Sequence, residues 1–151
     1  MKIRFFTVVL FSASVCGCAT VQYGSRDGEA DLHRLPPDAG KASLYVCRES
    51  AAFVGAGNRT TAFVDNKNIG TLKPGNFAHT VVEPGSHDIH IDRSPGGKSG
   101  TLTIDTKAND VPIVWVGVTG HGWGVLTVDE FEDRAEAERC VQGAKYALPT
   151  E

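Results

Sequence analysis

The stretch FVDNKNIGTLKPGNFAHTVVEPGSHDIHI, residues 63–91, indicates the fold class of this chain. Short apolar runs alternate in it with turn residues at the spacing that is typical of a β-sandwich or barrel. Asn66 tolerates positive φ, so it suits a tight hairpin between two strands. Pro84 and Gly85 supply the backbone angles that a type II turn needs. The stretch therefore predicts four consecutive strands joined by short turns.

The same spacing of apolar runs and turns extends on both sides of this stretch. We expect strands at Ala42–Arg48, Thr60–Val64, Asn68–Leu72, Phe77–Val82, Ser86–Ile91, Thr101–Ile104, Pro112–Val118 and Gly124–Val128. Beyond them, Asp133 and Glu136 have the spacing of a helix start, and the helix is expected to end near Gln142. The predicted fold class is all-β, a small antiparallel β-sandwich of about seven or eight strands with one short C-terminal helix.

Alternation of apolar and polar residues predicts which face of each strand is buried. Ile89 and Ile91 share one face of their strand, and Leu102 and Ile104 share one face of the next. Residues 111–118 are almost continuously apolar, which is typical of a central strand. Trp115 lies in this run and is expected in the core.

Three motifs in this region resemble those of a known type of domain. They are FVDNKNIG at residues 63–70, LKPG at 72–75 and VEPGSH at 82–87. Together they are similar to the turn pattern of PEGA-like domains, and especially to the uncharacterised bacterial lipoprotein domains built on that pattern. The resemblance covers roughly residues 42–140. It implies a small β-sandwich in the cell envelope, and it brings no catalytic residues with it.

The first 17 residues have the order of regions found in an export signal. Lys2 and Arg4 precede an apolar run of about eleven residues, which is too short to span a bilayer. The run ends in VCGC at residues 15–18, which resembles the lipobox of bacterial lipoproteins. Cys18 occupies the position of the acylated cysteine. The alternative is an ordinary cleaved signal with a coincidental cysteine.

Acylation of Cys18 would give a mature N-terminus with three acyl chains, such as palmitate, which is enough for durable anchoring. Ala19 follows in place of aspartate, a pattern similar to that of lipoproteins sorted to the outer membrane. We therefore expect a lipid-anchored protein of the cell envelope, in the outer membrane and facing the periplasm. Residues 18–41 lack a sustained period and contain adjacent prolines, which predicts a flexible tether. The sandwich domain would then span residues 42–148.

The charge balance argues against nucleic acid as a partner. The chain has a net charge of −3, and loss of Lys2 and Arg4 with the leader would leave 13 basic against 18 acidic residues, a net charge of −5. Carboxylates concentrate at residues 129–138, and we interpret them as the solvated start of a helix. An apolar content of 41% and a charged content of 22% also exclude a wholly disordered chain.

Cys47 and Cys140 remain in the domain after the leader, and they predict a disulfide. An exported protein enters an oxidising compartment, where such a bond persists. The alternative is two buried thiols at ordinary core positions, because the sequence does not fix the separation of their Cα atoms.

The histidines offer an alternative hypothesis of metal binding or hydrolysis. If Glu83 pairs with Ser86 across a two-residue turn, His79 lies directly opposite His90, with Asp88 nearby. A register change of one residue separates them, and solvated strand histidines are the competing interpretation. We expect no metal and no cofactor.

Aromatic and apolar residues in two glycine-containing segments are candidates for partner binding. They are Phe53, Val54, His121 and Trp123. The alternative is that they fold back to cap the sandwich. The expected function is that of a lipid-anchored, non-catalytic binding or scaffold module, attached to the membrane through its acyl chains and contacting an envelope protein or polysaccharide.

Overall fold

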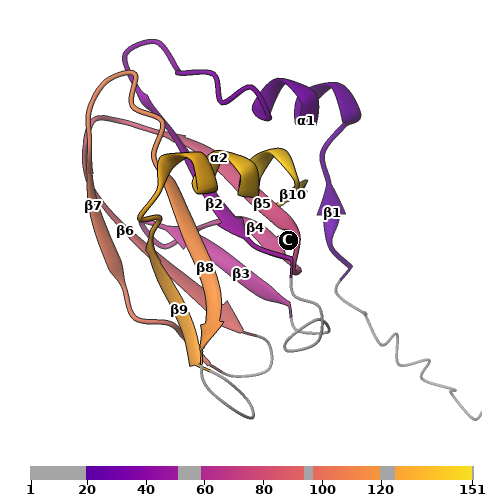
Figure 1. The fold of residues 1–151 in the computed structure, drawn as a ribbon. Coiled ribbons are helices and arrows are strands. Elements are labelled where there is room, and N and C mark those ends of the chain that lie inside the picture. The colour runs from indigo at the N-terminus through magenta and orange to yellow at the C-terminus, as the bar shows by residue number, and fades with distance from the viewer. Residues whose placement is uncertain (1–19, 51–58, 94–96, 120–124, 151) are drawn as a thin grey trace, which may run out of the picture.

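The computed structural model describes residues 20–50, 59–93, 97–119 and 125–150, which form a two-layer β-sandwich with two short helices (Figure 1). The elements in chain order are β1 (Gln22–Tyr23), α1 (Arg26–Leu32), β2 (Ala42–Arg48), β3 (Thr60–Val64), β4 (Lys67–Leu72), β5 (Asn76–Val82), β6 (Gly85–Arg93), β7 (Leu102–Thr106), β8 (Ile113–Thr119), β9 (Val125–Glu130), α2 (Arg134–Gln142) and β10 (Lys145–Leu148). Neither described helix is long and apolar enough to cross a membrane. The all-β sandwich predicted from the sequence is confirmed.

One sheet has the strand order β1-β10-β5-β2-β8-β9, and the other has the order β4-β3-β6-β7. All eight expected strands are present, each within two residues of its expected ends. Most strand pairs are antiparallel as predicted, but β2 pairs in parallel with β8 and β5 pairs in parallel with β10, so the larger sheet is mixed. Parallel neighbours require a crossover connection. Here β3 to β7 form the crossover between β2 and β8, and α2 carries the chain from β9 back to β10.

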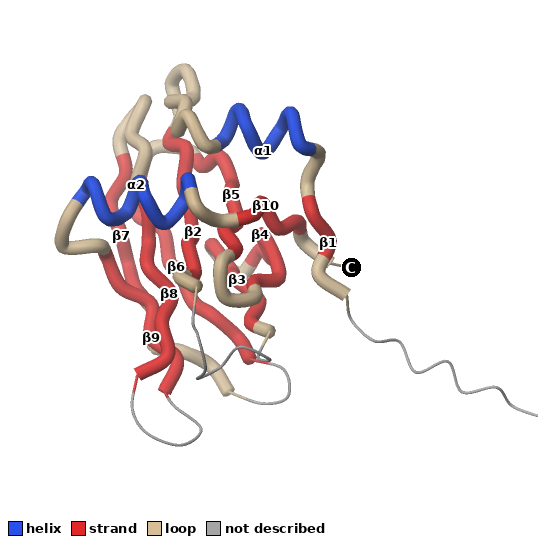
Figure 2. The backbone as a smooth tube through the Cα atoms, turned by 45° about the vertical axis from the view of Figure 1, so that its right-hand side comes forward, coloured by secondary structure: helices blue, strands red, loops and turns tan. Residues whose placement is uncertain are grey.

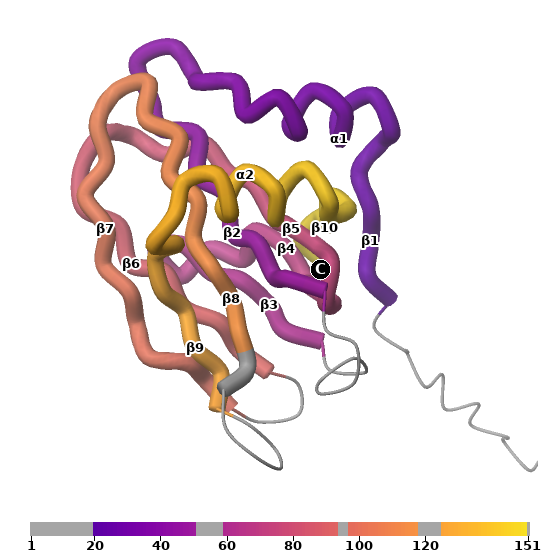
Figure 3. Tube along the Cα trace, viewed as in Figure 1, coloured from indigo at the N-terminus to yellow at the C-terminus, as the bar shows by residue number. Residues whose placement is uncertain are grey.

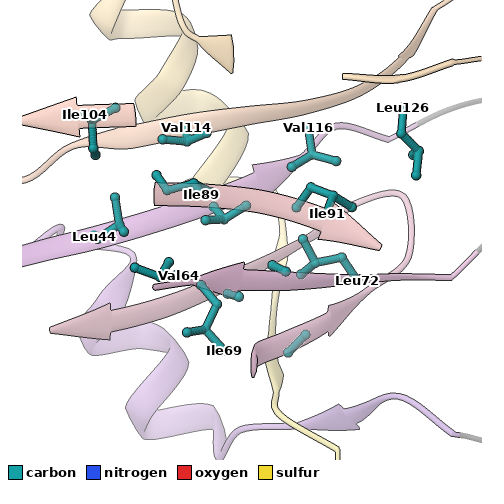
Figure 4. Packing of buried hydrophobic residues seen from close by; sticks show 14 residues of the cluster. Leu44, Val64, Ile69, Leu72, Ile89, Ile91, Ile104, Val114, Val116 and Leu126 are labelled. Carbon is teal, nitrogen blue, oxygen red and sulfur yellow. The ribbon is translucent and has the colours of Figure 1, made fainter. Parts of the chain in front are cut away.

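The main core lies between the two sheets (Figure 4). Leu44 and Val46 of β2 and Val114 and Val116 of β8 point inward from the six-stranded sheet. From the four-stranded sheet come, among others, Ile89, Ile91 and Ile104. The burial of the β6 and β7 isoleucines confirms the faces predicted by alternation.

A second cluster lies on the outer face of the six-stranded sheet. Figure 2 shows α2 crossing this face. Tyr45 and Cys47 alternate with the inward residues of β2 and so project to this side. Ala137 and Val141 of α2 cover them. The side chain of Asp133 caps α2 by accepting a hydrogen bond from the amide of Ala135 at 2.9 Å, which confirms the predicted helix start.

The turn between β3 and β4 is the tight hairpin that the sequence predicts. Val64 pairs with Lys67, and the two residues between them, Asp65 and Asn66, have φ values of 50° and 63°. Positive φ at both central positions is the requirement of a type I′ turn, whose twist matches that of the flanking strands.

The connection at Glu83 to Gly85 does not form the expected hairpin. β5 pairs with β2 and β10, whereas β6 pairs with β3 and β7, so the chain passes from one sheet to the other between them. Gly85 has a φ of 148°, well beyond the roughly 80° of a type II turn. Pro84 and Gly85 would change the direction of the chain in a hairpin as they do in this connection. β6 belongs to the four-stranded sheet because it pairs with β3 and β7.

The segment expected to be a flexible tether is folded onto the sandwich (Figure 3). β1 pairs with β10, and the Oγ of Ser25 caps α1 by accepting a hydrogen bond from the amide of Gly28. Leu32 and Leu35 pack against the outer cluster. A two-residue strand and a seven-residue helix are too short to show a period in the sequence, and so the prediction of an unstructured segment was wrong.

Candidate functional site

Several sequence-predicted site residues lie outside the residues that the structure describes. They are Cys18, Phe53, Val54, His121 and Trp123. Their roles remain predictions.

Cys47 of β2 and Cys140 of α2 form the predicted disulfide, with their Cα atoms 6.3 Å apart. The bond ties α2 to the outer face of the six-stranded sheet, where Ala137 and Val141 also anchor the helix. The position of α2 on the sheet is therefore fixed by a covalent bond as well as by packing. In this position α2 does not cover the part of the outer face of β8 and β9 that lies beside it.

The structure separates His79 from His90, so the proposed metal pair was wrong. His79 lies on β5 and His90 on β6, in different sheets, because the hairpin that would have paired them is not formed. Burial lowers the pKa of both imidazoles. The His90 ring stacks on Phe63 with centroids 4.9 Å apart. Among the described residues no group of three or more His, Cys, Asp or Glu side chains is arranged to hold a metal ion.

His79 contacts two residues of the neighbouring strand β2. His79 Nε2 lies 2.9 Å from Ser43 Oγ, and its ring lies against that of Tyr45, with centroids 4.7 Å apart. The pair has the composition of a nucleophile and its base. Ser43, however, is only 2% exposed, which places its hydroxyl out of reach of a substrate.

Trp115 lies on the outer face of β8, and the expectation that it belongs to the core was wrong. Across the sheet it pairs with Cys47 of β2 and Asp129 of β9. Its indole Nε1–H donates a hydrogen bond of 3.2 Å to Glu49 Oε2. A Cβ at Gly117 would overlap the six-membered ring of the indole, so the ring lies across the bare backbone of that glycine.

A surface cavity of about 280 Å³ opens over this indole. Its lining residues are Glu49, Trp115, Asp129, Glu130, Phe131, Glu132 and Glu136. Five of these seven side chains are carboxylates, two are aromatic, and none is basic. A neighbouring cavity of about 350 Å³, which Arg139 also lines, shares Glu49 and Glu136 with it. The cavity is therefore lined by two aromatic rings and by negatively charged side chains.

Sequence reasoning missed this site for two reasons. The carboxylates between 129 and 136 were interpreted as a solvated helix start, and Glu49 is 66 positions away from the tryptophan that it contacts. One local signal was present in the sequence. Gly117 follows Trp115 by two residues, so both lie on the same face of a strand, and a glycine there makes room for a ring lying flat.

A second polar cluster lies where the β3–β4 turn meets β6. His87 Nδ1 is 2.7 Å from Asp65 Oδ2, and His87 Nε2 is 2.7 Å from the carbonyl oxygen of Glu83. Both ring nitrogens face acceptors, so both hydrogen bonds form only when the ring is protonated. Burial opposes that charge, but the bonds to Asp65 and Glu83 outweigh it and raise the pKa of His87 above 6.5.

This geometry predicts a pH-dependent contribution of His87 to stability. A folded-state pKa above the unfolded value gives stabilisation that is complete below the unfolded pKa and is lost as pH rises through the folded pKa. The unsubstituted protein should therefore unfold at a higher urea concentration than His87→Gln, and the difference between the two midpoints should be larger at about pH 5 than at about pH 8. The same difference between the two proteins at both pH values would contradict the assignment.

The fold and the outer-face cavity define a class: a small disulfide-bonded β-sandwich with an acidic, tryptophan-floored surface site. Residues 38–114 match the family described as "Protein of unknown function (DUF2846)". That match covers half of the chain, and the chain belongs to this family.

Two further proteins are similar to parts of the chain. An uncharacterized protein of Haemophilus influenzae is 29% identical over 97 residues, which cover 58% of this chain and 56% of that protein. The chain thus matches little more than half the length of this relative. A solved structure described as the NMR structure of the protein from Eubacterium rectale has a TM-score of 0.43 and 12% identity, and the match covers 74% of this chain and 98% of that one.

Proposed function

We propose that this chain is a bacterial lipoprotein, anchored through acyl chains on Cys18, whose PEGA-like sandwich binds another envelope component without catalysis. The observation that carries the proposal is the disulfide between Cys47 and Cys140, since such bonds persist in exported proteins and are rare in the cytosol. It agrees with the export signal and the lipobox-like VCGC at residues 15–18. We also propose that the chain is located in the outer membrane and faces the periplasm.

The type I′ hairpin at Asp65 and Asn66 supports the PEGA-like assignment. The motif that suggested the resemblance, residues 63–70, supplies this turn and the strands on either side of it. The resemblance is therefore supported by the hairpin turn as well as by the sequence motif.

The proposed binding surface is the outer face of the six-stranded sheet around Trp115. β2 and β8 are parallel neighbours, so their last residues lie at the same end of the sheet. The predicted contact residues Phe53, Val54, His121 and Trp123 follow these two strands in the sequence and lie outside the described residues. The cavity over Trp115 is lined by residues of β8 and β9 and by Glu49, which follows β2, and this position supports the choice of the outer face.

Binding without catalysis is favoured by the burial of the polar groups. The described serine that contacts a histidine, Ser43, is covered by the fold. The carboxylates of the Trp115 cavity are exposed to solvent. No described histidine, serine, cysteine or lysine lines the cavity beside them. We therefore propose recognition, not turnover, as the activity.

Crosslinking in cells tests this proposal. A photoreactive amino acid replaces Val125 of β9, which is 66% exposed and is not among the residues that line the Trp115 cavity. In a matched variant it replaces Thr101, which is exposed beside β7 of the other sheet. We expect one or more discrete envelope adducts from position 125, absent from position 101. Adducts that are the same from both positions, or absent from position 125, would overturn the assignment of the binding face.

A further inference from the structure

We propose that the cavity over Trp115 binds the cationic head of a lysine or arginine side chain that projects from a protein partner. The inference rests on the proposed function, because it names the chemistry by which the module would recognise its partner. It is carried by three observations: the fixed indole, the charge around it, and the size of the cavity.

The indole of Trp115 is held in place on one side. The hydrogen bond from its Nε1–H to Glu49 fixes its edge, and the backbone at Gly117 lies against its six-membered ring. Trp115 is also one of the residues that line the cavity, so part of the indole is accessible from it. The negative face of an indole attracts a cation within about 6 Å of its centroid more strongly than the rings of Phe or Tyr do.

The charge around the ring favours a cation in the same position. The same cavity is lined by five carboxylates, those of Glu49, Asp129, Glu130, Glu132 and Glu136, and none of them takes part in an ion pair with a described residue. Arg139 lines the adjoining cavity and not this one. The nearby guanidinium of Arg134 is already bound to Glu138 and to the carbonyl oxygen of Val111. An anionic group would be repelled from the cavity, whereas a cation gains from both the ring and the carboxylates.

The cavity is large enough for this group. Its volume of about 280 Å³ accommodates one ammonium or guanidinium group with part of its alkyl stem. Tryptophan and arginine are both enriched among the residues that contribute most to binding energy at protein interfaces.

The test is a titration of the purified full chain in a non-ionic detergent, followed by NMR of the tryptophan indole N–H signals. The probes are N-acetyl-lysine amide and N-acetyl-arginine amide, and the neutral control is N-acetyl-citrulline amide. Trp123→Phe removes the second indole signal of the chain and so identifies that of Trp115. We expect both cations to shift the Trp115 signal saturably, with an affinity that falls as salt is added, and citrulline to leave it unshifted.

Two variants separate the site from the fold. Trp115→Leu removes the ring and Gly117→Ala displaces it, so each should weaken cation binding by about tenfold, followed at the backbone amides of Glu49 and Asp129. Retention of the remaining amide spectrum shows that both variants fold. Equal shifts from citrulline and arginine, no saturable shift from either cation, or unchanged affinity in both variants would overturn the site.

The titration uses neither the lipid nor a partner. Its failure would therefore remove the cation site and leave the proposal of an envelope binding module standing. Conversely, a chain that binds the cations but gives no adduct from position 125 in cells would retain the site and lose the proposed function.

Discussion

Reduction of the disulfide between Cys47 and Cys140 is expected to lower the free energy of unfolding by about 4 to 5 kcal/mol. The two cysteines are 93 positions apart, so the bond closes most of the folded domain into one loop and restricts the unfolded chain accordingly. The bond also holds α2 against the sheet at the edge of the Trp115 cavity. Urea unfolding with and without reductant measures the difference.

The double variant Cys47→Ala, Cys140→Ala provides the matched comparison. It should unfold at the lower urea concentration of the reduced protein and should not respond to reductant. An unchanged midpoint on reduction of the native protein would show that the loop contributes nothing to stability, against the chain-entropy argument.

Phe77→Ala is expected to cost about 3 to 5 kcal/mol, the range for removal of a large aromatic side chain from a core. Phe77 is fully buried in the outer cluster. Its ring meets those of His33, Tyr45 and Tyr146, with centroid distances of 5.6, 6.0 and 5.4 Å. It therefore links the N-terminal segment to the sheet and to the last strand.

The loss should be visible locally as well as globally. Hydrogen exchange of the α1 amides should accelerate in Phe77→Ala, because α1 is attached to the sandwich through this cluster. Val81→Ala is the control on the same strand, since Val81 is 39% exposed and its truncation should change stability by less than about 0.5 kcal/mol. Equal costs for the two substitutions would contradict the packing described for α1.

The local structure of the sandwich is predictable from the sequence because its signals are local. Apolar alternation, the Asp65 and Asn66 turn and the Asp133 cap each operate within a few residues, and each appears in the structure where the sequence places it. The partners of each strand are not local. β8 lies beside β2 and β10 beside β5, and these pairings join distant parts of the chain that no short motif connects.

The candidate site likewise has features that the sequence predicts and features that it does not. The disulfide followed from two cysteines and the compartment that the leader implies. The cavity over Trp115 did not, because an apolar run such as residues 111–118 is interpreted as buried on both faces. Only the inner face of β8 is covered by the other sheet, and α2 leaves the position of Trp115 open on the outer face.

Two parts of this small chain would have different roles. The leader and Cys18 would deliver the domain to the membrane surface, and the outer face of the larger sheet would contact its partner. Because residues 22–35 pair and pack against the domain and do not extend as a linker, they would shorten the reach of an anchor at Cys18. The binding face would thus be held near the membrane.

Intact mass spectrometry of the protein recovered from the membranes of bacteria that express the full chain tests the central claim most directly. We expect a chain that begins at Cys18 and carries three acyl chains. That mass should be retained in Cys16→Ser, apart from the substituted atom, and lost in Cys18→Ser. A chain with its leader uncut, or cleaved but without lipid, would contradict it.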